Sequence, residues 1–120
     1  MEVKTLDIES YLDGSHILKS LSIHAKKKEF VGIIGPNGSG KSTFLKCIYR
    51  TVQPSTGAIL LDDKNSKDFS MKESARKMAV VSQHNNYNFD FTVSDIVLMG
   101  RSPHKKFIEK DNVYDYRIME

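Results

Sequence analysis

The chain has 120 residues, of which 39% are hydrophobic and 28% charged, a length and composition typical of one soluble globular domain. Acidic and basic residues are interspersed to a net charge of +3, so nothing indicates a nucleic-acid partner. No apolar run approaches the roughly 18 residues of a membrane-spanning helix, and residues 1–5 lack the apolar segment of a signal peptide. Cys47 is the only cysteine, so no internal disulfide is possible. We expect Cys47 to be buried and the protein to be cytoplasmic.

The first 25 residues predict an antiparallel β ribbon. Apolar residues alternate with polar ones over residues 2–9 and again over 17–25, which is the period of a strand with one solvated face. Asp13 and Gly14 lie between them and form a strong hairpin-turn signal. We expect this ribbon to lie over the strand that follows it in the chain.

Residues 30–34 (Phe-Val-Gly-Ile-Ile) form an apolar run that predicts a short buried strand. Residues 35–42 then fit the pattern G-x-x-x-x-G-K-[ST] without a mismatch. An apolar stripe at helical spacing predicts a helix over residues 43–50. A strand before the loop and a helix after it are the context in which this pattern binds phosphate. The alternative is a Gly/Ser-rich turn that carries a lysine by chance.

The chemistry of phosphate binding needs these residue types in this order. Gly38 and Gly40 lack a Cβ, so the backbone can bend around a polyphosphate and direct its N–H groups inward. The unpaired N–H groups at the start of the helix favour an anion there. Lys41 can place its ammonium between the terminal phosphates, and the Ser42 hydroxyl can bind Mg²⁺.

The rest of the chain predicts two apolar strands, a polar loop and three helices: strands over 58–61 and 78–82, a loop over 83–90, and helices over 70–77, 93–99 and 109–120. Capping boxes mark the first two of these helices, Ser70 with Glu73 and Thr92 with Asp95. Strands alternate with helices, so we expect an α/β fold.

Taken together, these features resemble the nucleotide-binding subunit of an ABC transporter. Residues 35–43 match the phosphate loop of that family residue for residue. Tyr11 stands where the family has an aromatic residue, and residues 56–57 precede an apolar strand as they do in the family. Gln83 follows an apolar run where the family has a glutamine. Residues 92–104 resemble, more narrowly, the subgroup that imports iron chelates, haem or cobalamin. The resemblance extends over essentially the whole chain.

The resemblance implies an incomplete P-loop NTPase-type core with an N-terminal antiparallel β ribbon and the start of a helical subdomain. Residues 1–91 would form the partial nucleotide-binding core, and residues 92–120 the start of the helical subdomain. ATP and Mg²⁺ are the implied ligands. The implied partners are membrane-spanning permease subunits and a second copy of the ATPase subunit, at the inner face of the cell membrane. An importer of iron–siderophore-type substrates is the implied function.

The resemblance also implies roles for single residues. Tyr11 would stack on adenine, which in nucleic-acid systems is worth roughly 1–3 kcal/mol per base. Gln83 would reach the Mg²⁺ and the attacking water, and would share the catalytic role with Lys41. The residues that would contact the nucleotide phosphates are Asn37, Gly38, Ser39, Gly40, Lys41, Ser42 and Thr43. The alternatives are a core tyrosine at position 11 and an ordinary loop glutamine at position 83. Phe89 and Phe91 are either core residues or contacts to a membrane subunit.

The chain also departs from the family pattern. Lys28 stands where the family commonly has glycine, at some cost if its φ is positive. Within the 120 residues we find no Leu-Ser-Gly-Gly signature, no strand ending in Asp-Glu and no switch histidine. We therefore expect an N-terminal fragment of a longer ATPase. Without those groups to hold the metal and the water, hydrolysis by the chain alone should be slow or absent. The strand at 30–34 would also have an unpaired edge.

Two other functions stay open. The chain could be a non-catalytic remnant that binds nucleotide poorly or not at all. It could also be another P-loop enzyme such as a small-molecule kinase. Kinases of that kind carry an arginine-rich lid after the loop, whereas the arginines here are few and widely spaced: Arg50, Arg76, Arg101 and Arg117.

Overall fold

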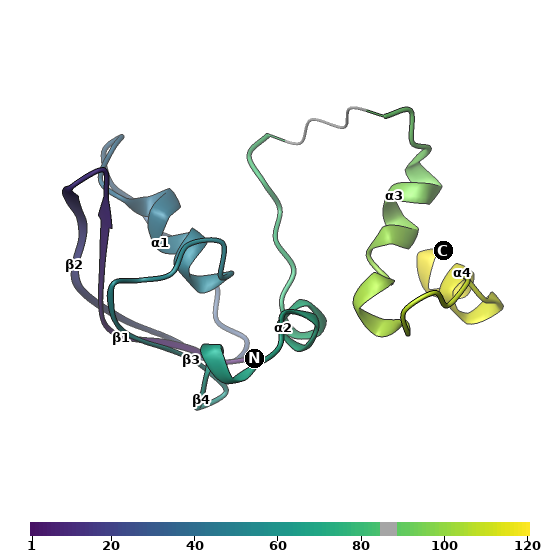
Figure 1. The fold of residues 1–120 in the computed structure, drawn as a ribbon, viewed down its shortest axis with the longest axis horizontal. Coiled ribbons are helices and arrows are strands. Elements are labelled where there is room, and N and C mark those ends of the chain that lie inside the picture. Colours follow the sequence, from purple (N-terminus) through teal and green to yellow (C-terminus); the bar gives the residue numbers. More distant parts are fainter. Residues whose placement is uncertain (85–88) are drawn as a thin grey trace. The chain divides into compact units, whose positions relative to one another are not determined.

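The computed structural model describes residues 1–84 and 89–120. Contacts within the chain divide it into two compact units, Met1–Lys77 and Met78–Glu120. Each unit has its own secondary structure, which Figure 1 shows along the chain. The functional division between residues 91 and 92 stays a prediction, and the part of the predicted loop at 85–88 lies outside the described residues.

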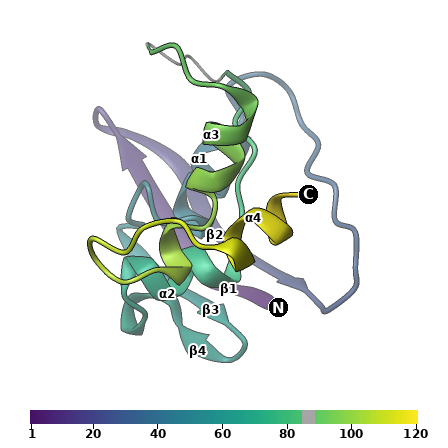
Figure 2. The same ribbon diagram turned by 90° about the vertical axis from the view of Figure 1, so that its right-hand side faces the viewer.

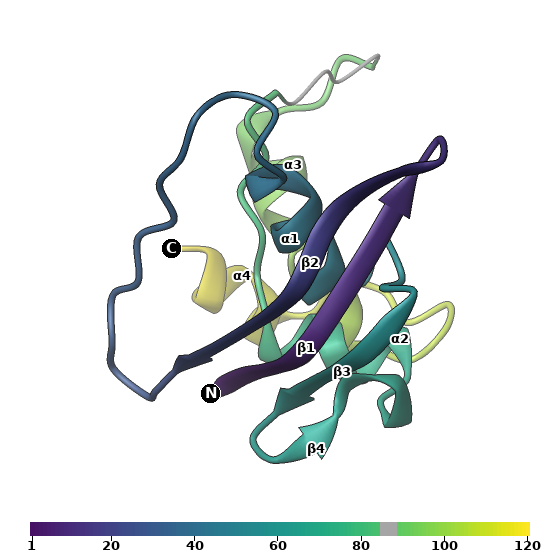
Figure 3. The same ribbon diagram turned by 90° about the vertical axis from the view of Figure 1, so that its left-hand side faces the viewer.

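The first unit is built on a four-stranded antiparallel sheet with the strand order β2-β1-β3-β4. Its strands are β1 (Val3–Leu12), β2 (Ser15–Ala25), β3 (Thr56–Leu61) and β4 (Lys64–Asn65). Figure 3 shows β1 between β2 and β3. The predicted ribbon and the predicted strand at 58–61 are therefore confirmed. The sequence patterns do not predict β4, which has only two residues.

The turn between β1 and β2 is the one that the sequence predicts. Asp13 and Gly14 have φ values of 48° and 77°, and positive φ at both central residues is the geometry that matches the twist of two paired strands. The turn sets the pairing that follows, Leu12 opposite Ser15 and then Tyr11 opposite His16. A two-residue turn thus fixes which side chains face each other near the tip of the ribbon.

Gly57 marks a close approach of β3 to β1. Its φ is 87°, and a Cβ built on it would lie 2.5 Å from the carbonyl oxygens of both Leu6 and Asp7. Real Cβ atoms do not approach backbone oxygens so closely. Both the backbone angle and the space therefore require glycine at this position.

Helix α1 (Lys41–Ile48) packs against the sheet and completes the core of the first unit. Phe44 and Cys47 are its buried residues, at 2% and 1% exposed. The buried thiol is confirmed, whereas Leu45 on the same helix is 45% exposed. The apolar side chains of this core are Ile8, Leu18, Phe44, Cys47, Ile59, Leu61 and Phe69.

Arg50 ends α1 and joins it to helix α2 (Met71–Lys77). Its φ of 67° is the left-handed conformation in which helices often end, usually at glycine. Its guanidinium donates hydrogen bonds to the carbonyl of Phe69 at 2.8 Å and to the hydroxyl of Ser74 at 2.7 Å. The Arg50 side chain, just after the end of α1, therefore provides hydrogen-bond donors for a carbonyl and a hydroxyl oxygen at the start of α2.

The predicted capping box of α2 is present. The Ser70 hydroxyl accepts from the Glu73 N–H at 3.2 Å, and the Glu73 carboxylate accepts from the Ser70 N–H at 2.7 Å. The hydrogen bonds that the N–H and the hydroxyl of Ser70 donate to the Glu73 carboxylate lower its pKa below the usual value. A short 3₁₀ helix, η1 (Ser66–Asp68), precedes the cap.

The second unit contains α3 (Val93–Met99), η2 (Ser102–His104) and α4 (Val113–Met119). Figure 2 shows α3 and α4 joined by the segment that carries η2. The predicted helix over 93–99 is confirmed at both ends, with Thr92 and Asp95 in a capping box. The helix predicted over 109–120 begins only at Val113, because Asn112 caps it in a second box with Asp115.

Asp115 is the buried centre of the second unit at 2% exposed. Its carboxylate accepts from the Asn112 N–H at 3.1 Å and from Arg101 Nε at 3.0 Å, and it lies 3.4 Å from Lys105 Nζ. The Asn112 hydrogen bond first, and then the two cations, hold the pKa of Asp115 below its usual value. The loop and α4 are therefore joined by one satisfied carboxylate.

Two predicted strands are wrong. Residues 30–34 and 78–82 have no strand ladder in the structure. Phe30 and Ile34 are 101% and 95% exposed, and Val81 is 93% exposed. Each run has the composition of a buried strand, but such strands need neighbours from elsewhere in the chain. None of the described residues supplies a ladder to them.

Candidate functional site

The loop at residues 35–40 leads into α1 through two left-handed glycines. Gly38 has φ 78° and Gly40 has φ 94°, and Gly40 is the N-cap residue of the helix. The Ser39 N–H donates to the carbonyl of Pro36 at 3.3 Å, which closes a turn within the loop. Residues other than glycine rarely adopt these angles. The glycines of the predicted pattern therefore stand where the backbone bends.

Lys41 folds back over this loop. Its Nζ donates to the carbonyl oxygens of Gly35 at 2.7 Å and Pro36 at 2.6 Å, and lies 3.3 Å from the Ser39 hydroxyl. A Cβ on Gly35 would lie 2.9 Å from the same hydroxyl, so the loop closes tightly on itself. The ammonium is thus held within the curve of the loop.

The N-terminus of α1 is open to an anion. No side chain caps it, and its first turn contains no acidic residue. Unpaired N–H groups at a helix start carry a partial positive charge and favour negative ligands. Ser42 is exposed beside them. Together with Lys41, this end of the helix presents donors and no competing carboxylate from its own first turn.

Gly40 places the loop against the ribbon. A Cβ on Gly40 would lie 3.1 Å from side-chain carbons of both Ile17 and Leu18 and 3.3 Å from the Ile17 carbonyl. The glycine therefore lets the loop approach β2 near the tip of the ribbon. That tip also carries Tyr11, which is 51% exposed. The predicted adenine-binding residue and the loop thus lie in one unit, close to the same stretch of β2.

The pairing of Tyr11 with His16 is a feature that the sequence analysis does not predict. The two rings are stacked, with centroids 4.4 Å apart and planes inclined by 8°. Tyr11 is not the core residue of the alternative interpretation. The sequence does contain a signal for the stacked pair, because the Asp13–Gly14 turn places position 16 directly opposite position 11.

The loop residues lie together in the first unit, whereas Gln83 belongs to the second unit. Asn37, Gly38 and Ser39 are exposed, and Gly40, Lys41 and Thr43 are half-buried. Gln83 is exposed in the second unit. Its role beside the metal therefore stays a prediction.

The residues present fit a nucleotide-bound Mg²⁺ more closely than a metal held by protein alone. Among residues 1–84 and 89–120, no three His, Cys, Asp or Glu side chains gather as a metal site. Mg²⁺ commonly keeps several waters and binds through substrate phosphates with one or two protein ligands. The exposed hydroxyl of Ser42, at the open helix end, is a suitable ligand of that kind.

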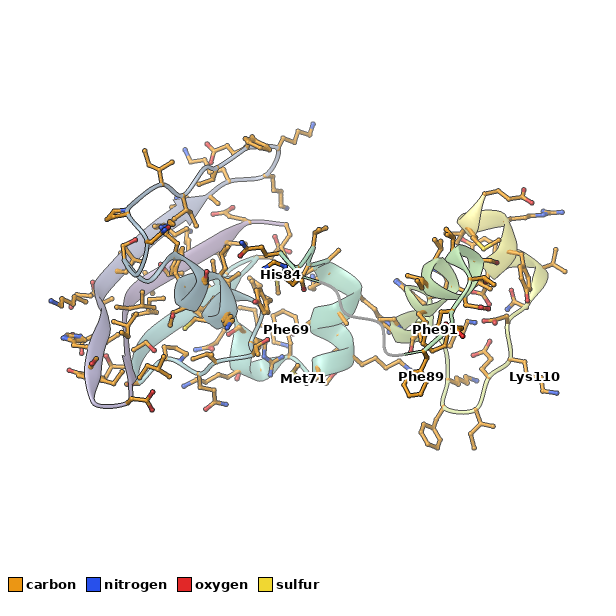
Figure 4. All side chains as sticks on the ribbon, turned by 90° about the horizontal axis from the view of Figure 1, so that it is seen from above. Phe69, Met71, His84, Phe89, Phe91 and Lys110 are labelled. Carbon is orange, nitrogen blue, oxygen red and sulfur yellow. The ribbon has the colours of Figure 1, made fainter. Side chains whose placement is uncertain are left out.

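A separate cavity of about 280 Å³ lies at the other end of α1. Its lining includes Cys47 from α1, Arg50 just after that helix, Ile59 from β3 and Met71 from α2. Burial raises the pKa of the Cys47 thiol, which keeps it protonated and unreactive. Figure 4 shows Met71 close to Phe69 at the start of α2. The cavity contains none of the loop residues and is distinct from the candidate site.

Phe89 and Phe91 lie on the segment before α3 (Figure 4). Their rings form an edge-on pair with centroids 6.0 Å apart, and the side chains are 74% and 41% exposed.

Within the described part of the chain, no helix is long and apolar enough to cross a membrane.

Comparison with known proteins identifies the family. The family model described as "ABC transporter" matches residues 18–118, which is most of the chain. The chain belongs to the ABC transporter family, as the sequence motifs predict. Its N-terminal antiparallel ribbon and the phosphate loop that leads into α1 agree with a P-loop NTPase-type core.

Three relatives carry names of import proteins. The petrobactin import ATP-binding protein FpuC of Bacillus anthracis is 35% identical over 86% of this chain and 38% of its own length. The hemin import ATP-binding protein HmuV of Gloeobacter violaceus is 35% identical over 89% and 39%. The cobalamin import ATP-binding protein BtuD of Halobacterium salinarum is 36% identical over 87% and 26%. The chain therefore spans well under half the length of these relatives.

A solved structure agrees with the family assignment. A bacterial Atm1-family ABC exporter with ATP bound is similar over 83% of this chain and 18% of its own, with a TM-score of 0.74 and 27% identity. The family is therefore shown by sequence and by fold.

Proposed function

We propose that the chain forms the ATP-binding part of an ABC importer subunit for iron–siderophore-type substrates. Family membership and the import relatives support this proposal. The proposed partners are membrane-spanning permease subunits and a second copy of the ATPase subunit. The proposed place of action is the inner face of the cell membrane. Residues 1–91 would serve as the partial nucleotide-binding core and residues 92–120 as the start of the helical subdomain.

The observation that carries the proposal is the geometry of the loop. Lys41 Nζ is held by the carbonyl oxygens of Gly35 and Pro36, beside a helix start with no side-chain cap. A triphosphate would offer these same donors charged oxygens, which are stronger acceptors than carbonyls. We propose that residues 37–43 hold the phosphates, with Lys41 at the terminal phosphates.

The remaining site residues have separate proposed roles. Ser42 would bind Mg²⁺, which supplies charge neutralisation at the β- and γ-phosphates. Tyr11 would stack on adenine with its exposed ring. Gln83 would contact the metal and the attacking water. These roles are carried over from the family onto matching positions of this sequence.

Calorimetric titration of the full chain with Mg-ATP tests the proposal. We expect weak binding by the wild type and its loss in Lys41→Ala, because Lys41 is the only charged residue of the loop. Lys46→Ala is the matched control, since Lys46 is an exposed lysine in the last turn of the same helix. Equal ATP affinity in the wild type and Lys41→Ala would contradict the phosphate assignment.

We propose that these 120 residues bind Mg-ATP without appreciable hydrolysis. Phosphoryl transfer needs the metal held and the attacking water positioned, and only Ser42 and the exposed Gln83 are proposed for these tasks among the described residues. Phosphate release from the purified chain should therefore match the Lys41→Ala background. Turnover well above that background would contradict this proposal and also exclude the non-catalytic remnant.

The substrate class has its own test. Disruption of the gene that encodes the chain should abolish uptake of a radiolabelled iron–siderophore complex and leave uptake of haem and cobalamin unchanged. Loss of haem or cobalamin uptake instead would replace the proposed substrate and leave the ATP-binding role intact.

A further inference from the structure

We propose that His16 is a positioning residue for nucleotide binding, which holds the Tyr11 ring in the orientation that receives the base. The proposal rests on the proposed ATP-binding function and extends it by one residue. It begins from the stacked pair at the tip of the ribbon, where the ring centroids are 4.4 Å apart and the planes are inclined by 8°.

The stack leaves the two faces of Tyr11 unequal. One face is covered by the imidazole, while the side chain as a whole is still 51% exposed. A planar base can therefore approach the other face, where base–aromatic stacking is favourable. The imidazole, the phenol and the base would then form three parallel layers.

The imidazole has no hydrogen bond at its buried nitrogen. His16 Nε2 is buried with no hydrogen-bond partner and lies 3.9 Å from a carboxylate oxygen of Glu9. That carboxylate accepts from the Ser20 hydroxyl at 3.1 Å. A buried ring nitrogen without a partner contributes no stabilising hydrogen bond, so the stack on Tyr11 is the contact through which we propose that the two rings orient each other.

The position of His16 also links the ring pair to the phosphate loop. His16 directly precedes Ile17, and a Cβ on Gly40 would lie within 3.3 Å of both the side chain and the carbonyl of Ile17. The loop's last glycine therefore contacts the residue next to the stacked histidine. A ring held still at this point reduces the ordering cost of binding a nucleotide.

The test compares two ligands on the full chain, Mg-ATP and inorganic tripolyphosphate with Mg²⁺. A base platform affects only the first. His16→Ala should weaken ATP binding about three- to tenfold, the cost of immobilising one side chain, and should leave tripolyphosphate binding unchanged. His16→Phe keeps a planar ring behind Tyr11 and should restore ATP affinity. Circular dichroism of each variant verifies its folding.

Two further variants separate positioning from a general effect. His24→Ala is the matched control, because His24 lies on the same strand and also faces a carboxylate, that of Glu2, but does not stack on Tyr11. It should change neither affinity. In a Tyr11→Ala background, His16→Ala should cause no further loss, because His16 acts only through that ring.

The outcomes distinguish this proposal from the ATP-binding function. If Lys41→Ala weakens both ligands while His16→Ala weakens neither, or both equally, the role of His16 is wrong and the function stands. The same holds if His16→Ala still weakens ATP binding in the Tyr11→Ala background. If Lys41→Ala weakens neither ligand, the function fails and the role of His16 fails with it.

Discussion

The β1–β2 ribbon and the segment at residues 30–34 are both predicted as strands from the sequence, but only the ribbon forms a ladder. The ribbon forms a ladder from Val3 to Ala25, whereas Phe30 and Ile34 stand fully exposed. The ribbon finds its partner across a two-residue turn, so pairing costs little loop entropy. A buried parallel strand needs partners that are distant in sequence. The ribbon therefore forms through its own turn, whereas residues 30–34 have no ladder partner among the described residues.

Amide hydrogen exchange is the measurement that should separate the ribbon most clearly from residues 30–34. Ladder amides of β1 should exchange about a thousandfold or more slowly than those of residues 30–34 and 78–82, because they open only with the sheet. The measurement is amide exchange followed by mass spectrometry or NMR. Comparable protection at 30–34 would show that this segment has a partner in solution and would overturn the contrast.

Substitution of a large apolar residue should separate the two regions in stability. Ile8→Ala removes a side chain that is 0% exposed and should cost about 2–5 kcal/mol of unfolding free energy, the range for buried Ile or Leu to Ala. Phe30→Ala is the control, since Phe30 is 101% exposed, and it should change stability by less than about 0.5 kcal/mol. Urea denaturation measures both. A cost at Phe30 equal to that at Ile8 would mean that residues 30–34 are packed.

Substitution of two glycines, one in the sheet and one in the segment at residues 30–34, should show the same contrast with a smaller change in stability. Gly57→Ala must fit a Cβ 2.5 Å from two carbonyl oxygens at φ 87°, so we expect a loss of about 1–3 kcal/mol from the β1–β3 ladder. Gly32→Ala meets nothing within 4 Å and should be nearly neutral. Thermal melting by circular dichroism compares them, and a neutral Gly57→Ala would contradict the close approach of the two strands.

The smallest effect concerns pH and the second unit. The lowered pKa of Asp115 means that the folded state prefers its charged form. Its contribution to stability is therefore present above the ordinary carboxyl value of 3.8 and is lost as the pH falls through the lowered value. Asp115→Asn should remove this acid dependence from α4, as followed by NMR signals of its amides. Asp90→Asn, at an exposed position, should retain it.

The sequence predicts those parts of the fold whose causes are local. The Asp13–Gly14 turn, the capping box of Thr92 with Asp95 and the glycine bends of the loop all depend on neighbouring residues. Asn112 has the same three-residue spacing to an acid, and that signal could have placed the start of the helix predicted over 109–120 correctly. Lys28 has the positive φ for which the sequence analysis expects a conformational cost at a residue other than glycine, with a value of 65°.

The candidate site divides in the same way. The loop geometry around Lys41 follows from the motif, because glycine spacing determines where the backbone can bend. The bond from Arg50 to Ser74 and the stack of His16 on Tyr11 join residues across the folded unit. The first has no sequence signal that we recognise, whereas the second follows from the hairpin register. The relation of Gln83 to the loop depends on distant packing and stays a prediction.

The single thiol of the chain has a practical consequence. Cys47 is 1% exposed and its pKa is raised, so maleimide reagents should not react with it in the native protein. A cysteine introduced at a surface position could then carry a fluorophore or spin label without removal of the native one. Pairs of such labels, one on each compact unit, would report the interdomain distance as ATP is added.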